Sequence, residues 1–263
     1  MRLNTGVSLS TNHRLGSLLS TPPVVFVHGL IGTLQFPEFA ARVATDALAP
    51  DLLGYGTLQH LPAEAITVAT QVEHLRATID ASFPNRPVTL VGHSVGGVVA
   101  VLLADAYPAR VASVVSIEGN FTLKDAFWSS SVARMSPDDA EALMDGFRTD
   151  PSAWLARSGV PPTARNLAVA ARWLAQQPGR TVRAMAQTVV AVTEAPAYLA
   201  RARRVFTHCP VHLMAGERSR PGWDIPEWAL ERAASTTVLP DTGHMMMVED
   251  TDGFVAALHR ILA

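Results

Sequence analysis

Gly92-His93-Ser94-Val95-Gly96-Gly97 is the stretch that decides the fold. It follows a short apolar run, Pro87 to Val91, and opens a nearly all-apolar helical pattern from Val95 to Tyr107. A Gly-x-Ser-x-Gly pattern is weak evidence alone, but a strand before it and a helix after it are the setting of a nucleophile elbow. There the serine occupies a strained turn, and the flanking glycines let strand and helix approach each other. The alternative is a glycine-rich turn with an ordinary serine.

Short apolar runs alternate with longer helical patterns along the chain, which is typical of an α/β fold with a mostly parallel sheet and helices on both faces. Strands are predicted over 23–27, 46–50, 87–91, 111–117, 210–215 and 236–239, and helices over 64–83, 95–107, 226–234 and 250–262. Residues 120–205 contain no convincing strand and predict several helices, among them 164–177 and 181–193. The sequence therefore predicts an α/β core, 1–119 and 206–263, interrupted by a helical cap, 120–205.

Composition excludes several classes of protein. At about 150 residues per domain, 263 residues predict one or two domains. The net charge of −2 is scattered, which argues against a nucleic-acid partner or a polybasic membrane surface. Cys209 is the only cysteine, so a disulfide scaffold is excluded. The N-terminus has no apolar signal region and the chain has no long apolar run, so we expect a cytoplasmic monomer or homodimer without stable membrane insertion.

Two further motifs follow predicted strands. His28-Gly29-Leu30-Ile31-Gly32 comes after the first strand, where the Leu30 N–H would be an oxyanion donor beside the Val95 N–H. Thr242-Gly243-His244-Met245 comes after the last strand, where a histidine can reach a serine at the carboxyl edge of the sheet as general base. His93 is expected to support the elbow rather than act as the base.

With Asp51-Leu52-Leu53-Gly54-Tyr55-Gly56, these motifs resemble the α/β-hydrolase superfamily over nearly the whole chain. The resemblance implies that Ser94 is the nucleophile and His244 the base. It also implies that the Leu30 and Val95 N–H groups form the oxyanion hole. Asp51 matches a turn that is usually structural in that superfamily, and we do not nominate it.

The acid of the triad departs from the pattern of the superfamily. Most members place an aspartate three residues after a glycine that ends the strand following the cap, and Ser219 occupies that position here. We expect Glu118, at the end of the strand over 111–117, to be the acid, because active groups collect at the carboxyl ends of strands. Members of the haloalkane dehalogenases and zearalenone-type lactonases place their acid at this strand end. Glu217 and Asp224 are alternatives, and Glu118 could instead pair with an arginine of the cap.

The expected activity is cofactor-independent hydrolysis of a small apolar or amphipathic carboxylic ester or lactone through an acyl-enzyme. Thioester hydrolysis, C–C bond hydrolysis, a non-hydrolytic lyase and a ligand-binding protein remain alternatives. The elbow holds serine rather than aspartate, so chemistry through an aspartyl ester is not available, and no metal-ligand or nucleotide motif occurs. Candidate substrate contacts, each of which could equally be core packing, are Gly29, Asn120, Phe121, Trp128 and Met245.

Overall fold

The computed structural model describes residues 21–35 and 37–263. The N-terminal segment, for which the sequence predicts no secretory signal, lies outside the described residues. Six strands form one parallel sheet in the order β2-β1-β3-β4-β5-β6. The strands are β1 (Val24–Val27), β2 (Ala47–Leu48), β3 (Val88–His93), β4 (Val111–Ile117), β5 (Val211–Gly216) and β6 (Ser235–Leu239).

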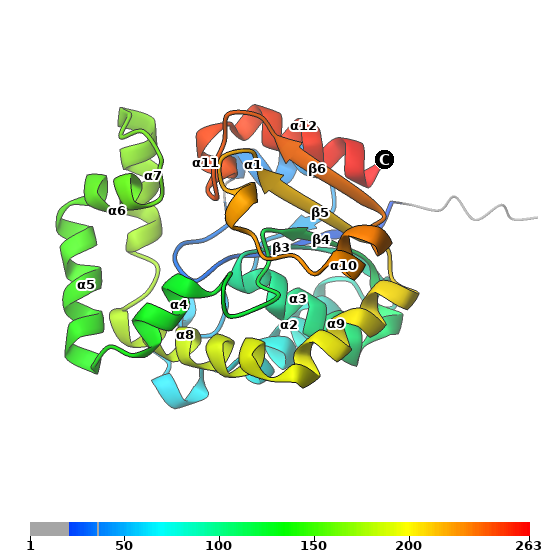
Figure 1. The fold of residues 1–263 in the computed structure, drawn as a ribbon, viewed down its shortest axis with the longest axis horizontal. Coiled ribbons are helices and arrows are strands. Elements are labelled where there is room, and N and C mark those ends of the chain that lie inside the picture. The colour runs from blue at the N-terminus through cyan, green and yellow to red at the C-terminus, as the bar shows by residue number, and fades with distance from the viewer. Residues whose placement is uncertain (1–20, 36) are drawn as a thin grey trace, which may run out of the picture.

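Helices cover both faces of the sheet (Figure 1). α2 (Val68–Ser82), α3 (Val95–Ala106) and α9 (Pro196–His208) lie on one face, and α1 (Pro37–Val43) and α12 (Thr251–Leu262) lie on the other. β1 and β3 are buried at every position, which explains why their residues are mostly apolar and do not alternate with exposed polar ones. The first ten residues of α3 are buried, as its all-apolar sequence predicts.

Several elements differ in length from their sequence patterns. The strand predicted over 46–50 is reduced to the two residues of β2 at the edge of the sheet. The helix predicted over 64–83 begins at Val68, because the Thr67 side chain accepts a hydrogen bond from the Thr70 N–H and caps it there. The segment before that cap holds only the short 3₁₀ turn η2 (Ala63–Ala65). The last helix is preceded by a separate turn, α11 (Met246–Glu249).

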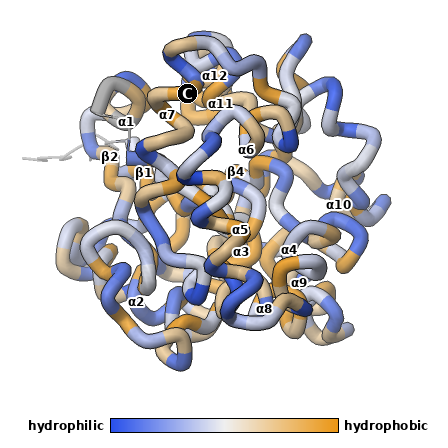
Figure 2. Tube along the Cα trace, turned by 90° about the vertical axis from the view of Figure 1, so that its left-hand side faces the viewer, coloured by the Kyte–Doolittle hydropathy of each residue, from blue (hydrophilic) through white to orange (hydrophobic). Residues whose placement is uncertain are grey.

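The chain between β4 and β5 is helical, as the sequence predicts. Its helices are α4 (Phe127–Ala133), α5 (Pro137–Thr149), α6 (Pro151–Arg157), α7 (Ala164–Leu174), α8 (Gly179–Glu194) and α9. Ser136 and Asp150 cap α5 and α6 ahead of a proline, so these starts were readable from the sequence. α5, α6 and α7 stand beside the sheet in Figure 1, and Figure 2 views the molecule from that side, with hydrophobic and hydrophilic residues mixed along them.

α9 belongs to the helical segment in sequence but packs against α3 of the sheet layer. Arg204 of α9 pairs with Asp105 at 2.9 Å, and Arg201 bonds the same carboxylate. The predicted boundary at residue 205 therefore falls inside a helix rather than in a linker.

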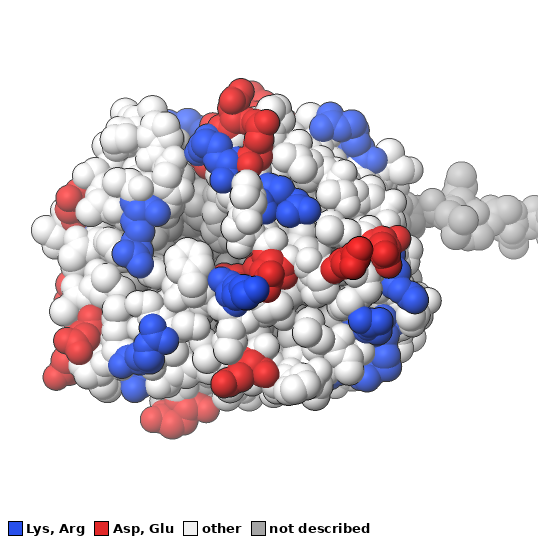
Figure 3. Space-filling model, in the orientation of Figure 1, with Lys and Arg blue, Asp and Glu red and all other residues white. Residues whose placement is uncertain are grey.

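Charged side chains of both signs are interspersed on the face drawn in Figure 3. None of the helices in the described ranges combines the length and apolar character needed to cross a bilayer.

Candidate active site

Ser94 stands in a sharp turn between β3 and α3. Its backbone has φ 54° and ψ −121°, a strained conformation of the kind that costs about 1–3 kcal/mol and gathers at functional sites. Crowding explains the flanking glycines: a Cβ on Gly92 would lie 2.6 Å from the Gly96 carbonyl oxygen. A Cβ on Gly96 would lie 2.1 Å from the carbonyl oxygen of Val27. Strand, turn and helix thus have the geometry that the motif predicts.

Glu118 follows β4 immediately and has a left-handed backbone with φ 43°. Glu118 Oε2 lies 2.6 Å from Nδ1 of His244. The other carboxylate oxygen, Oε1, accepts hydrogen bonds from the Gly216 N–H at 2.9 Å and the Ser219 hydroxyl at 2.5 Å. Three donors therefore converge on one buried carboxylate, two from the end of β5 and the segment after it and one from the loop after β6.

The electrostatics favour an ionised Glu118. Burial of this side chain opposes ionisation, but the hydrogen bonds that it accepts, that of His244 first, hold the pKa of Glu118 below its ordinary value. An ionised carboxylate only accepts hydrogen bonds, so the proton of His244 lies on Nδ1 and leaves Nε2 free to act as a base. This is the tautomer that a serine nucleophile requires.

His93 holds the backbone of His244 rather than competing with His244 for the Ser94 hydroxyl proton. Its Nε2–H donates to the His244 carbonyl oxygen at 3.0 Å, and the two rings lie 4.6 Å apart. Burial lowers the pKa of His93 to about 3, so this ring stays neutral at ordinary pH.

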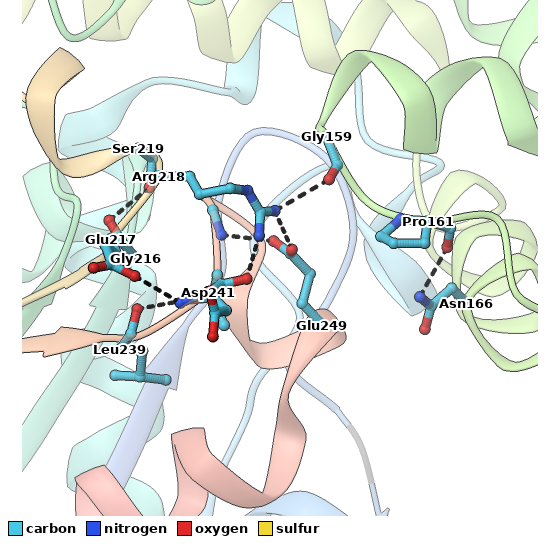
Figure 4. Close-up of polar contacts among 12 residues, drawn as sticks. Gly159, Pro161, Asn166, Gly216, Glu217, Arg218, Ser219, Leu239, Asp241 and Glu249 are labelled. Carbon is cyan, nitrogen blue, oxygen red and sulfur yellow. Dashed lines mark hydrogen bonds and ion pairs between the residues drawn. The ribbon is translucent and has the colours of Figure 1, made fainter.

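Arg218 and Glu249 fasten the loop that carries His244 (Figure 4). Glu249 Oε1 accepts from the Gly243 N–H at 2.9 Å, and Oε2 accepts from the Arg218 guanidinium. Arg218 also donates to the carbonyl oxygens of Asp241 and Gly159, the latter at 3.2 Å in the loop between α6 and α7. One side chain therefore connects the His244 loop to the helical segment.

The loop after β1 is held by its carbonyl and amide groups. The Tyr55 hydroxyl donates to the Leu30 carbonyl oxygen at 2.9 Å, and the Gly32 N–H donates to Gln177 Oε1 at 3.1 Å. The Val95 N–H is the first of α3 and has no acceptor within the helix. Neither the Leu30 N–H nor the Val95 N–H donates to another described residue, so both remain available to a ligand oxyanion.

A cavity of about 630 Å³ opens above Ser94. Four aromatic side chains contribute to its lining, namely Phe127, Trp128, Trp154 and Trp223. Other lining residues are His93, Ser94, Glu118, Asn120, His244 and Met245. Of the candidate substrate contacts, Gly29, Asn120, Trp128 and Met245 line this cavity. A mostly apolar pocket with a few polar groups at one place suits a small amphipathic ligand.

Phe121 does not line the cavity, contrary to the sequence-based expectation. Its ring packs against Phe206, Trp223 and Trp228 with centroids 6.2–6.3 Å apart. The apolar side chain is 2% exposed and belongs to the core beneath the helical segment. Val95 is likewise buried and is not among the lining residues, so only its backbone N–H is relevant to the site.

The alternative acids lie elsewhere. Glu217 accepts a hydrogen bond from the Asp241 N–H, and Asp224 accepts one from the Thr122 hydroxyl. Neither bonds His244, and no arginine of the described chain pairs with Glu118. Within the described residues Ser94 and His244 line the same cavity without a hydrogen bond between them. Such contacts are often long before substrate binds.

Sequence reasoning missed the supporting residues. The sequence shows only that Ser219 stands where most members have an aspartate. It does not show that the Ser219 hydroxyl donates to Glu118, the carboxylate that bonds His244 instead. Gln177, Arg218 and Glu249 carry no local signal, because their partners are distant in sequence.

The model of the alpha/beta hydrolase family matches residues 24–257, and the chain belongs to this family. Among curated proteins, it is 28% identical over 251 residues to 2-succinyl-6-hydroxy-2,4-cyclohexadiene-1-carboxylate synthase of Enterobacter sp. (strain 638), covering 92% of each chain. A match to ethanol acetyltransferase 1 of Eremothecium cymbalariae is 30% identical but spans only 105 residues, 38% of this chain and 28% of that protein.

Solved structures share the fold. MenH from S. aureus superposes with a TM-score of 0.70 at 19% identity, covering 94% of this chain and 95% of that one. A thermophilic esterase from Thermogutta terrifontis gives a TM-score of 0.66 at 20% identity, covering 92% and 89%. At these identities the likeness establishes the architecture and leaves the reaction to be argued from the site.

Proposed function

We propose that the protein hydrolyses a carboxylic ester or lactone through an acyl-enzyme on Ser94. The observation that carries the proposal is the 2.6 Å contact between His244 Nδ1 and Glu118 Oε2, made in the cavity that Ser94 also lines. It combines a strained serine, a histidine of defined tautomer and a buried carboxylate, which is the constellation of a serine hydrolase.

In the proposed reaction, His244 Nε2 takes the Ser94 hydroxyl proton as Oγ attacks the ester carbonyl carbon. The oxyanion that forms accepts hydrogen bonds from the Leu30 and Val95 N–H groups. Collapse breaks the bond to the alcohol oxygen, which receives the proton from His244. Water then repeats the sequence on the acyl-serine and releases the acid. With a lactone, alcohol and acid leave as one molecule. Glu118 stays ionised throughout and stabilises the imidazolium.

We also propose that residues 120–205 act as a cap over this chemistry. Trp154, Arg157 and Ser158, at the end of α6, line the cavity that holds Ser94, and the Gly159 carbonyl bonds Arg218 of the core. A lid built this way would set substrate size and exclude water.

Hydrolysis of p-nitrophenyl esters, together with labelling by a fluorophosphonate, tests the proposal. Wild type is expected to hydrolyse short or medium esters and to become labelled at Ser94. Ser94→Ala is expected to lose both properties while its circular dichroism spectrum stays unchanged. Full esterase activity in Ser94→Ala would refute the mechanism.

A second candidate is a non-hydrolytic enzyme, because the match to the Enterobacter synthase covers 92% of each chain. Product analysis separates the two: ester hydrolysis incorporates one oxygen from labelled water into the acid. A reaction that leaves no acyl-serine incorporates none and shows no burst of p-nitrophenol. Fluorophosphonate labelling without any ester turnover would favour this second candidate.

A further inference from the structure

Asn120 carries a buried polar atom that the protein itself does not satisfy. The residue is 5% exposed, and its Oδ1 is buried without a hydrogen-bond partner. Leaving a buried acceptor unpaired costs about 1–3 kcal/mol, so native proteins rarely keep one without a reason. Of the cavity-lining residues in the described chain, Asn120 alone has such an atom.

Hydrogen bonds from buried side chains hold the backbone on which Asn120 stands. The Asn120 carbonyl oxygen accepts from the hydroxyl of Tyr198 at 2.8 Å, and the Gly119 carbonyl oxygen accepts from Trp223 Nε1 at 2.8 Å. Tyr198 and Trp223 are themselves buried. This held segment places Asn120 in the lining of the cavity that Ser94 and His244 also line.

Two other polar groups of the cavity, those of Asp125 and Ser158, already have partners within the protein. The Asp125 carboxylate accepts from the Phe121 and Asp224 N–H groups, and the Ser158 hydroxyl donates to the Trp154 carbonyl oxygen. A ligand would gain little from competing with these bonds. The unpaired Asn120 oxygen instead favours binding of a ligand with a hydrogen-bond donor, because a hydrogen bond to a buried oxygen is stronger than one in water.

We propose that Asn120 determines specificity for a hydroxyl-bearing substrate, an apolar ester or lactone with a hydroxyl group close to the scissile carbonyl. The inference rests on the proposed function, since it concerns the substrate of that same site. The hydroxyl donates to Oδ1, and the tryptophan side chains of the cavity contact the rest of the molecule. A site built to hydrogen-bond a hydroxyl discriminates strongly against the analogue that lacks it.

The test compares two esters that differ by one hydroxyl, p-nitrophenyl 3-hydroxybutyrate and p-nitrophenyl butyrate. In wild type, kcat/KM is expected to be about tenfold or more higher for the hydroxylated ester. Asn120→Leu, similar in size but without polar atoms, is expected to abolish this preference, so that the ratio of the two kcat/KM values falls to about one. Because it removes an unsatisfied buried group, it is also expected to raise Tm. Asn120→Ala gives the same comparison should leucine not fit.

Ser158→Ala is the matched control, because it removes a cavity hydroxyl that is already bonded within the protein. Its preference between the two esters is expected to match wild type. Equal kcat/KM for both esters in wild type, or equal losses on both in the Asn120 variants together with a lower Tm, would overturn the inference while the hydrolase assignment stands. Absence of turnover on both esters and of fluorophosphonate labelling would instead overturn the proposed function and the inference with it.

Discussion

Glu118→Gln is the sharpest test of the site, because the structure dictates how the glutamine must sit. The Gly216 N–H and the Ser219 hydroxyl both donate to one carboxylate oxygen, so the amide oxygen of glutamine is required there. The amide NH₂ then faces His244 Nδ1 and donates to it. His244 is left with its proton on Nε2 and can no longer accept one from Ser94.

The magnitude follows from the same contacts. Turning the amide around would leave the buried Gly216 N–H facing an NH₂ group without an acceptor, at a cost of about 2 kcal/mol, so only about 3% of molecules would have the productive arrangement. This sets the smallest expected loss in kcat at about 30-fold. A fully wrong tautomer, together with the loss of the negative charge, extends the loss towards about 10⁴-fold, as in other triads.

Steady-state hydrolysis of p-nitrophenyl esters measures this loss, with circular dichroism and Tm to check folding. Glu217→Gln is the matched control, since that carboxylate lies nearby but bonds the Asp241 N–H rather than His244. We expect the control to stay within about twofold of wild type. A folded Glu118→Gln that keeps about a third or more of the wild-type kcat would refute the tautomer argument.

Three further outcomes are expected. Arg218→Gln leaves the Glu249 carboxylate, only 7% exposed, without its cation. This variant should lower both Tm and kcat. A change in KM alone would count against a role of Arg218 in holding the His244 loop. Because the pKa of Glu118 is lowered in the folded state, its ionisation stabilises the fold above its ordinary pKa of 4.5, and this contribution is lost as pH falls through the lowered value. The Tm difference between wild type and Glu118→Gln, measured from about pH 7 to about pH 3, should therefore shrink on acidification. Gly96→Ala places a methyl group against the Val27 carbonyl, so soluble expression with unchanged Tm would contradict the close packing of the elbow.

The sheet was predictable because its signals are local. Parallel strands buried on both faces are mostly apolar, and the apolar runs of β1, β3 and β4 indicate such strands directly. The lengths of edge strands and the ends of helices were not predictable. β2, for example, is limited to the two residues that pair with β1. The start of α2 depends on a threonine cap that the apolar periodicity does not encode.

Part of the site was predictable, again because its signals are local in the sequence. Ser94 and His244 stand in motifs whose neighbours in sequence are their neighbours in space. Glu118 was chosen over Glu217 as the partner of His244 for two reasons. The usual aspartate is replaced by Ser219, and active groups gather at the carboxyl ends of strands. The unpaired amide of Asn120 was beyond reach, because whether a buried group finds a partner depends on the packing of α9 and the loop after β5.

The loop after β1, which carries Leu30 and Gly32, and the turn at Gly56 are both bound by the segment between α7 and α8. The Gly32 N–H bonds the Gln177 side chain, and the Gly56 N–H bonds the Gln176 carbonyl at 2.7 Å, both in the short link between α7 and α8. Replacing residues 120–205 by the corresponding insertion of a relative, in order to alter selectivity, would break those two hydrogen bonds. A chimaera should therefore retain Gln176 and Gln177 and exchange only helices on either side of them, since a foreign link would place a new pocket above a displaced Leu30 loop.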